Sequence, residues 1–297
     1  MRPRINAGSN KMWTMMIEFA TPIEIGGPAV DVVGSGGDRR NTVNISTMAA
    51  IVAAAAGARV VKHGNRAASS ACGSADVLEA LGVVLDLAPE LQPQVVDQVG
   101  IGFLFAPQYH PALRHASVTR RELGIPTIFN FLGPLANPAQ PISQAVGVAD
   151  PRMAELMAGV FASRGNYGLV VHGGDGLDEL TTTTSSTVWV YADGSVARMD
   201  LDPLTLGVPR ATLSDLVGGD AVANAQVVRE VVAGQPGPIR DVVVLNAAAA
   251  LVAYGKPAAS RLEDDFADEL ERARQAIDSG AAQSKLQEWI AVTQSLR

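Results

Sequence analysis

From residue 30 onward, short runs of apolar residues alternate with Ala-rich segments whose apolar positions have helical spacing. Residues 30–33 predict a strand, and residues 46–56 predict a helix that ends at Gly57. Residues 59–62 resume as a strand. This order of strand, helix and strand favours a parallel sheet covered by helices.

The same rhythm continues over the next segment. Residues 75–81 have apolar side chains at helical spacing, with Ser74 as the expected N-cap and Gly82 as the expected end of the helix. Residues 83–87 are apolar and predict a third strand. The fold class that follows is α/β, with a mainly parallel sheet and flanking helices.

The pattern changes between residues 89 and 124. Residues 90–99 and 111–123 both have helical patterns, and no convincing strand lies between them. We therefore expect a small helical sub-domain inserted into the α/β unit.

After this insertion the α/β rhythm returns. The elements expected there are an extended segment over residues 127–132, an amphipathic helix over 152–163, a buried strand over 167–172 and closing helices over 246–253 and 262–277. Residues 181–199 are rich in Thr, Val and Ser around an Asp193-Gly194 turn. This pattern is typical of a β-hairpin, and we expect it to form an antiparallel edge.

The composition narrows the class of protein. The chain has 297 residues, of which 47% are hydrophobic, enough for one large domain with an appendage or for two domains. The net charge of −7 and the pI near 5.1 do not favour a broad basic face for nucleic acid. The single cysteine, Cys72, suits a reducing compartment, no export signal is visible, and no apolar run reaches the roughly 20 residues that cross a bilayer. We expect a soluble, cytoplasmic protein without a membrane partner.

A glycine loop, Gly34-Ser-Gly-Gly-Asp38, follows the first predicted strand. Glycines let the main chain approach a ligand and present N–H groups to phosphate oxygens, although a simple tight turn is the alternative interpretation. The next segment places Asn44, Ser46 and Thr47 at the N-terminus of the Ala-rich helix, where the helix dipole favours an anion. A capping role for Ser46 or Thr47 is compatible with anion binding.

A second polar loop, Lys62-His-Gly-Asn-Arg66, follows the next predicted strand. Because ligands of open α/β sheets bind at the carboxyl ends of the strands, we expect this loop and the glycine loop to lie together. Lys62 supplies a charge for phosphate, Gly64 permits close approach, and Asn65 offers both a donor and an acceptor. An ordinary polar surface loop is the alternative.

An acidic pair, Asp178-Glu179, follows a later predicted strand. Adjacent carboxylates are costly unless they are solvated or neutralised, and a divalent cation such as Mg²⁺ neutralises them while it bridges to phosphates. Solvent exposure is the alternative, and Asp175 is a further carboxylate nearby. In the helical insertion, Arg120 or Arg121 is a candidate to bind a substrate carboxylate through its forked guanidinium group.

Seven short motifs follow one another along the chain: Gly-Ser-Gly-Gly-Asp, Asn-Ile-Ser-Thr, Lys-His-Gly-Asn-Arg-x-x-Ser-Ser, Gly-Ser-Ala-Asp-x-Leu-Glu-x-Leu-Gly, Arg-Arg-Glu-Leu-Gly, Phe-Asn-Phe-Leu-Gly-Pro-Leu-Ala-Asn-Pro and Asp-Gly-Leu-Asp-Glu-Leu. In this order, from about residue 30 to at least residue 246, the chain resembles the anthranilate phosphoribosyltransferases of tryptophan biosynthesis. The resemblance implies transfer of the phosphoribosyl group of phosphoribosyl pyrophosphate (PRPP) to the amine of anthranilate, with release of pyrophosphate and with Mg²⁺ as the cofactor.

The resemblance also assigns roles position by position. The residues that would hold the donor are Gly34, Gly37, Asp38, Thr42, Asn44, Ser46, Thr47 and Lys62. Those that would line the anthranilate path are Asn65, Ser74, His110 and Arg120, the first arginine of Arg-Arg-Glu-Leu-Gly. Further substrate-binding positions are Ile45, His63, Gly64, Arg66, Ser69 and Ser70. The implied catalytic residues are Lys62, Asn65 and Arg120, and the implied magnesium ligands are Ser46, Asp178 and Glu179.

The family fold implied by the resemblance has two domains with the active site between them. A small, discontinuous helical domain would consist of residues 1–25 and about 89–124, and an α/β domain of about 26–88 and 125–297. A homodimer is also implied. Family members carry a longer helical lead before the glycine loop than this chain does, and those helices contribute to the dimer contact.

The charges of the reaction indicate how such a site would act. Cleavage at the anomeric carbon leaves positive character on the sugar and negative charge on pyrophosphate, so the metal and Lys62 are expected to stabilise the departing phosphates. The aromatic amine is neutral near pH 7, and no general base is assigned to His63 or His110. Two residues depart from the family pattern: Ser35 stands where Thr is usual, and Arg39 where Gly is usual.

Two other functions compete with this one. A pyrimidine nucleoside phosphorylase of the same fold would use inorganic phosphate and a nucleoside, but the Lys-His-Gly-Asn-Arg stretch does not support it. A non-catalytic relative that binds nucleic acid would need a basic groove, which the negative charge of the chain disfavours.

Overall fold

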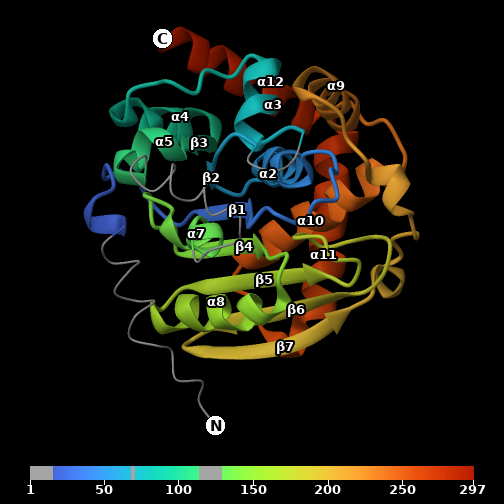
Figure 1. Cartoon of the computed structure of the whole chain (residues 1–297). Helices are drawn as coiled ribbons and strands as arrows, with labels where there is room; N and C mark the ends of the chain where they lie inside the picture. The colour runs from blue at the N-terminus through green and yellow to red at the C-terminus, as the bar shows by residue number, and fades with distance from the viewer. Residues whose placement is uncertain (1–15, 68–70, 114–128) are drawn as a thin grey trace.

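The computed structural model describes residues 16–67, 71–113 and 129–297. Seven strands within these residues form one sheet (Figure 1). In spatial order its strands are β3 (Ile101–Phe105), β2 (Val60–Gly64), β1 (Val30–Gly34), β4 (Ser143–Gly147), β5 (Tyr167–Gly173), β6 (Ser186–Ala192) and β7 (Ser195–Leu201). Neighbours from β3 to β5 are parallel, and β6 and β7 continue the sheet antiparallel. The predicted fold class, α/β with a mainly parallel sheet, is confirmed.

Helices cover both faces of this sheet. They are α2 (Ile45–Ala55), α3 (Ser74–Leu81), α4 (Gln92–Val99), α5 (Ala106–Tyr109), α7 (Phe129–Leu132), α8 (Pro151–Ser163), α9 (Ala221–Val232), α10 (Pro238–Tyr254), α11 (Leu262–Asp278) and α12 (Ala281–Ser295). Short 3-10 segments are Pro89–Leu91, Pro111–Leu113, Pro134–Ala136, Pro203–Leu206, Leu213–Leu216 and Ala259–Arg261. α8 packs against β5, β6 and β7, and α10 packs against α2, β1, β4 and β5; Figure 1 shows α8 in front of the sheet and α10 behind it.

Alternate residues of a strand reach two different cores, because successive side chains point to opposite faces of a sheet. In β5, Leu169 and Val171 belong to the core formed with α2 and α10, whereas Val170 belongs to the core formed with α8. A strand buried on both faces is apolar along its whole length. This explains why the buried strand over residues 167–172 is visible in the sequence.

The strongest sequence signals are confirmed. The predicted strands over 30–33, 59–62 and 167–172 correspond to β1, β2 and β5, and the predicted helices over 46–56, 75–81, 90–99, 152–163, 246–253 and 262–277 to α2, α3, α4, α8, α10 and α11. The predicted hairpin is β6 and β7, joined at Asp193 and Gly194 with φ of 48° and 74°. Two left-handed residues are what a two-residue type I′ turn requires, and the Asp-Gly pair supplies them.

The prediction of a strand over residues 83–87 is wrong. Val83, Leu85 and Leu87 are buried, which gives the segment its apolar pattern, but the segment forms no ladder with the sheet. The Val84 N–H instead donates to the Thr293 hydroxyl of α12, at 3.2 Å. The segment is therefore held by packing and by a side-chain hydrogen bond.

The edge strand lies where we expected none. β3 falls inside residues 89–124 and pairs in parallel with β2, so the expectation of a purely helical insertion is wrong in this respect. A five-residue apolar run cannot be distinguished from a buried helical segment by periodicity. Of the helix expected over residues 111–123, only Pro111–Leu113 is described, as a 3-10 turn. The division into two domains stays a prediction.

Two local expectations are also corrected. Residues 129–132 form α7 instead of an extended segment, and residues 127 and 128 lie outside the described part of the chain. The N-cap of α3 is Gly73 instead of Ser74, because the Asp76 carboxylate accepts a hydrogen bond from the Gly73 N–H at 2.9 Å. The hydrophobic pattern did not predict β4, α9 and α12.

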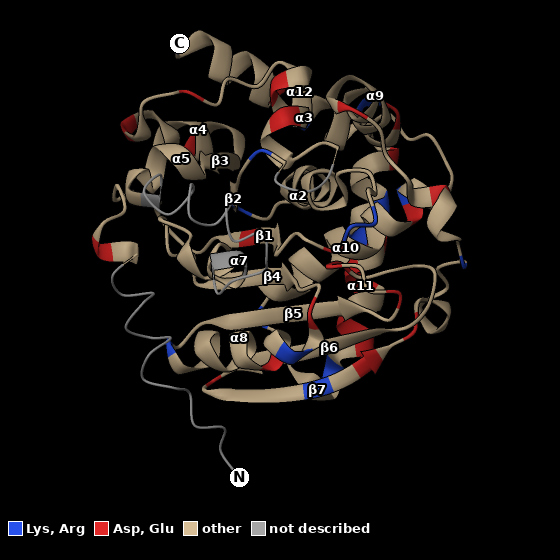
Figure 2. Ribbon diagram, in the orientation of Figure 1, with Lys and Arg blue, Asp and Glu red and all other residues tan. Residues whose placement is uncertain are grey.

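The distribution of charged residues concerns the nucleic-acid alternative, and the length and hydropathy of the helices concern a membrane. In the view of Figure 2, the Lys and Arg residues of the described segments are scattered among Asp and Glu. Within residues 16–67, 71–113 and 129–297, no helix is both long and apolar enough to cross a membrane.

Candidate active site

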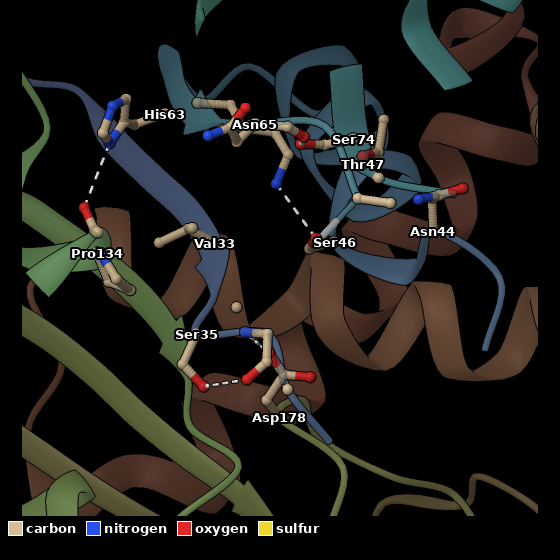
Figure 3. A pocket seen from close by; sticks show the side chains of 18 of the residues that line it. Val33, Ser35, Asn44, Ser46, Thr47, His63, Asn65, Ser74, Pro134 and Asp178 are labelled. Atoms are coloured by element: carbon tan, nitrogen blue, oxygen red, sulfur yellow. Dashed lines mark hydrogen bonds between the residues drawn. The ribbon is translucent and has the colours of Figure 1, made fainter. Parts of the chain in front are cut away.

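Three loops meet at the carboxyl edge of the sheet, after β1, β2 and β5. The strand register brings them together, since Gly34 of β1 lies opposite Gly147 of β4, which in turn lies opposite Val171 of β5. With the N-terminus of α2, these loops line a cavity of about 390 Å³. Figure 3 shows Asp178 beside Ser35 on one side of this cavity and His63 near Pro134 on another.

Every predicted site residue that the structure describes lines this cavity. From the glycine loop and α2 these are Gly34, Gly37, Asp38, Thr42, Asn44, Ile45, Ser46 and Thr47. From the second loop, α3 and later segments they are Lys62, His63, Gly64, Asn65, Arg66, Ser74, His110, Asp178 and Glu179. Ser69, Ser70, Arg120 and the alternative Arg121 lie outside the described residues. The functional role of each residue stays a prediction.

Two glycines allow the acidic loop to approach the strands. A Cβ on Gly147 would lie 1.5 Å from the Asp178 carbonyl oxygen, and a Cβ on Gly34 would lie 2.3 Å from Asp178 Oδ2. Both distances are far inside van der Waals contact, so a side chain at either position would displace the loop. The glycines at the ends of β1 and β4 therefore leave the space in which the loop of the acidic pair packs against the strands.

Backbone N–H groups hold both carboxylates. Asp178 Oδ2 accepts from the Gly36 N–H at 2.7 Å, and Glu179 Oε1 accepts from the Ser46 N–H at 3.0 Å. The second bond places a carboxyl oxygen at the N-terminus of α2, where the helix dipole favours negative charge. The other oxygen, Glu179 Oε2, is buried and has no hydrogen-bond partner among the described residues.

Negative charge on Asp38, Asp178 and Glu179 is unfavourable in the protein alone. Burial, followed by the charge of Asp38, raises the pKa of Asp178 to about 7. Burial and then the charge of Asp178 raise the pKa of Glu179 well above its ordinary value, and burial raises that of Asp38. Since all three shifts disfavour the ionised form, an added cation would relieve the cost of this cluster.

The geometry fits a cation that completes its ligand shell with substrate. Among the described residues, no group of three or more His, Cys, Asp or Glu side chains is arranged to hold a metal ion. Mg²⁺ is commonly bound by one or two carboxylates together with phosphate oxygens and water, so it does not require such a group. Asp178 and the unpartnered Oε2 of Glu179 suit that arrangement.

Lys62 is the buried cation of the site. Its ammonium group donates to the Val32 carbonyl and, at 3.2 Å, to Ser46 Oγ. Burial lowers its pKa to about 8, although the charges of Asp31 and Glu179 oppose the shift. The side chain therefore brings a positive charge into the cavity next to the first turn of α2.

Asp31 is a further buried residue that sequence reasoning missed. Its carboxylate accepts from the His63 N–H at 3.1 Å and from Asn137 Nδ2 at 2.9 Å. Burial raises its pKa to about 6. A charged residue inside the apolar run that forms β1 was the available signal, because a buried carboxylate is rarely left without partners.

Two histidines stand on the other side of the cavity. The rings of His63 and His110 are 5.2 Å apart at 61°, and His63 Nδ1 lies 3.2 Å from the Gly133 carbonyl. Burial lowers the pKa of His63 to about 3 and lowers that of His110. Both rings are therefore neutral at physiological pH and offer polar atoms without charge.

Two of the predicted substrate-binding residues, Ser74 and Arg66, are held by neighbouring parts of the chain. Ser74 Oγ donates to the Asn65 carbonyl at 3.2 Å. The Arg66 guanidinium is paired with Asp76 at 3.1 Å and with Glu79 at 2.5 Å, so its charge is already neutralised within the chain.

The loop between β5 and β6 is fixed by polar groups outside the cavity. Asp175, the third carboxylate considered in the sequence, accepts from the Thr181 hydroxyl at 2.7 Å and from the Leu177 N–H at 3.1 Å, so it stabilises the turn. Asn246 of α10 accepts from the Leu180 N–H at 3.0 Å and donates to the Leu180 carbonyl at 2.8 Å. One asparagine thus anchors the residue that follows the acidic pair.

The fold and the site define a class of transferase. Residues 26–283 match the family described as Glycosyl transferase family, a/b domain. The anthranilate phosphoribosyltransferase of Thermobifida fusca is 58% identical over 280 residues, which cover 94% of this chain and 80% of that protein. The chain belongs to the anthranilate phosphoribosyltransferase family, and the predicted family is confirmed.

Solved structures agree with this assignment. The crystal structure of anthranilate phosphoribosyltransferase from Thermus thermophilus superposes with a TM-score of 0.88 at 41% identity, covering 95% of this chain and 83% of that one. The Saccharomyces cerevisiae enzyme in complex with PRPP and Mg superposes with a TM-score of 0.86 at 29% identity, covering 95% of this chain and 78% of that one.

Substitution Asn246→Ala is expected to lower the free energy of unfolding by about 2 kcal/mol, because it leaves the N–H and carbonyl of Leu180 without their partner. Urea unfolding measures the change. As a control, Gln226→Ala removes an exposed side chain of α9 and should change stability by less than about 0.5 kcal/mol. Equal midpoints for the two variants would contradict the anchoring role of Asn246.

Proposed function

We propose that this protein transfers the 5-phosphoribosyl group of PRPP to the amine of anthranilate, giving N-(5-phosphoribosyl)anthranilate and pyrophosphate in tryptophan biosynthesis. The observation that carries the proposal is the shared cavity that joins the glycine loop, the N-terminus of α2, Lys62 and the acidic pair in a chain 58% identical to an anthranilate phosphoribosyltransferase. The nucleoside phosphorylase and nucleic-acid alternatives lack a comparable observation.

The donor would lie against the glycine loop and α2. The glycine loop at Gly34 and Gly37 brings the main chain close to the cavity, where N–H groups bind phosphate oxygens without a charged side chain. The N–H groups of the first turn of α2 are already bonded within the chain, so this turn contributes the favourable end of the helix dipole. Thr47 Oγ1 is buried at this turn without a hydrogen-bond partner in the described structure, and Lys62 adds positive charge. These groups are suited to stabilise the negative charge that develops on pyrophosphate as the anomeric bond breaks.

Ser46, Asp178 and Glu179 are the residues that would hold Mg²⁺. A bound magnesium ion would supply positive charge to the diphosphate of the donor. The chain's part is to keep Asp178 and Glu179 oriented through the Gly36 and Ser46 N–H groups before substrate arrives.

The acceptor would lie between the histidines and Asn65. His63 and His110 are neutral, and the aromatic amine needs no prior deprotonation, so positioning of the amine near the anomeric carbon is the main task of this side. Arg120 is the proposed partner of the anthranilate carboxylate, with Asn65 and Ser74 along the path. We assign no general base.

The assembly and location follow the family. We propose a homodimer in the cytoplasm, with the small helical domain of residues 1–25 and about 89–124 beside the α/β domain. The single cysteine, Cys72, is compatible with a reducing compartment.

The purified protein mixed with anthranilate, PRPP and Mg²⁺ should consume anthranilate, because its amine becomes substituted. Loss of anthranilate fluorescence over time measures the reaction. A reaction without PRPP serves as the control. A constant signal from folded protein would reject the proposed activity.

The double substitution Asp178→Asn with Glu179→Gln should lower kcat/KM by about 100-fold, or roughly 3 kcal/mol, because the neutral amides no longer attract Mg²⁺. Steady-state kinetics over a range of Mg²⁺ concentrations measure the effect. Asp175→Asn, in the same loop but bonded within the turn, is the matched control for metal binding. An unchanged magnesium requirement in the double variant would refute the metal assignment.

Arg120→Ala should raise the KM for anthranilate about 10-fold to 100-fold, as expected when a charge-assisted hydrogen bond worth roughly 1.5–3 kcal/mol is lost. The KM for PRPP should change little. Arg121→Ala is the neighbouring control and should leave both values near those of the wild type. Equal damage to both substrates, or a larger effect from Arg121→Ala, would argue against the assignment of Arg120.

A further inference from the structure

The segment before α9 is docked alongside the exit of the glycine loop. The Val43 N–H donates to the Leu216 carbonyl at 2.9 Å, and the Gly218 N–H donates to the Asn41 carbonyl at 2.8 Å. Between these bonds, Thr42 and Val217 form an isolated antiparallel bridge. Residues 216–224, which we call the α9 clamp, are thus fixed to the main chain that leads into α2, although no residue of the clamp lines the cavity.

Asn224 completes this contact with its side chain. It is 2% exposed, and its Oδ1 accepts from the Gly219 N–H at 2.7 Å within the clamp. Its Nδ2 donates to Asn44 Oδ1 at 2.9 Å. Asn44 Nδ2 then donates to the Cys72 carbonyl at 3.1 Å, in the loop that precedes α3. One chain of amide hydrogen bonds therefore joins the clamp, the N-cap of α2 and a second wall of the cavity.

The hydrogen bond from Asn224 engages the side chain of Asn44, the N-cap residue of α2, so that this side chain does not cap the helix. An N-cap asparagine ordinarily turns its Oδ1 toward the N–H groups of the second or third residue of the helix. Asn44 is the N-cap, yet its side chain makes no capping bond. The N–H of the second helical residue, Ser46, is instead bonded to Glu179. Because Asn224 occupies Asn44 Oδ1, that oxygen does not compete with Glu179 for the Ser46 N–H.

We propose that Asn224 is a positioning residue for the phosphoribosyl donor: by holding the Asn44 amide away from the helix, it leaves the Ser46 N–H to Glu179 and so keeps in place the acidic pair that would hold Mg²⁺ against the diphosphate of PRPP. The inference rests on the proposed function, since it concerns the donor side of that site. Asn224 acts through Asn44 and does not itself touch the substrate. The acceptor side, formed by His63, Asn65 and His110, is not part of this chain of bonds.

Two substitutions test the bond. Asn224→Ala removes it, and Asn224→Asp keeps the size of the side chain and an acceptor for the Gly219 N–H while it removes the donor to Asn44. In both variants Asn44 Oδ1 loses its partner and can turn toward the helix, with the bond from Nδ2 to the Cys72 carbonyl left to hold the amide. We expect the KM for PRPP, and the Kd for PRPP with Mg²⁺ measured by calorimetry, to rise about tenfold, while the KM for anthranilate stays within about twofold. Gln226→Ala, at an exposed position further along α9, is the control and should change none of these values.

A double-mutant cycle separates positioning from a general structural effect. If Asn224 acts through Asn44, then Asn224→Asp should have little effect on PRPP affinity in an Asn44→Ala background. Independent, additive losses in the two variants would overturn the inference. Unfolding of both Asn224 variants, or a parallel rise in the KM values of both substrates, would also overturn it by making the role of Asn224 purely structural.

The outcomes distinguish this inference from the proposed function. If the wild-type protein consumes anthranilate but the Asn224 variants bind PRPP as tightly as it does, the inference fails and the function stands. If the wild-type protein binds PRPP without turnover, the function fails, and the calorimetric cycle still decides the role of Asn224. A wild-type protein that does not bind PRPP overturns both.

Discussion

The arrangement of the site depends on the burial of two adjacent carboxylates against main-chain amides. Asp178 and Glu179 are drawn into the carboxyl edge of the sheet by the N–H groups of Gly36 and Ser46. Their raised pKa values show that burial, together with the charge of Asp38 on Asp178 and of Asp178 on Glu179, disfavours the charged forms there. Hydrogen bonds therefore hold Asp178 and Glu179 in place, but their negative charge is unfavourable unless a cation binds beside them. The glycines at the ends of β1 and β4 follow from this constraint, since any Cβ would displace the acidic loop.

Much of this site was predictable because parallel strands deliver their following loops to one edge. Gly36 of the glycine loop and Asp178 of the acidic pair are 142 residues apart along the chain, yet the loop of each follows an apolar strand signal. Local residue types were enough to identify the loops, and topology then brought them together. The described residues among those predicted all line one cavity, while Arg120, Ser69 and Ser70 lie outside the described part of the chain.

What the sequence did not predict has a common physical cause. Residues 83–87 and β3 are both short and mainly apolar, with Val83, Leu85 and Leu87 buried in the first, and only the second finds a backbone partner in the sheet. Pairing is a property of distant chain segments, so a local pattern cannot tell the two apart. β4 was missed for a related reason: Ser143 and Gln144 interrupt its apolar pattern, but they are buried and hydrogen-bonded within the fold.

The buried asparagines are a second class of missed residue, and they explain how the loops of the site are held in place. Each uses both ends of a neutral amide to join two parts of the chain. Asn246 binds both polar groups of Leu180, Asn224 joins Gly219 to Asn44, and Asn137 joins Asp31 to Ala139. An amide can be buried at far lower cost than a charge, provided that its donor and acceptor are both satisfied. The partners lie up to 180 residues away. Asn246 is the one polar residue between Val242 and Ala253 of α10, which offered a signal, whereas Asn224 sits in a mixed helix that offered none. Charged residues thus mark the chemistry of this site, and neutral amides fix the geometry on which that chemistry depends.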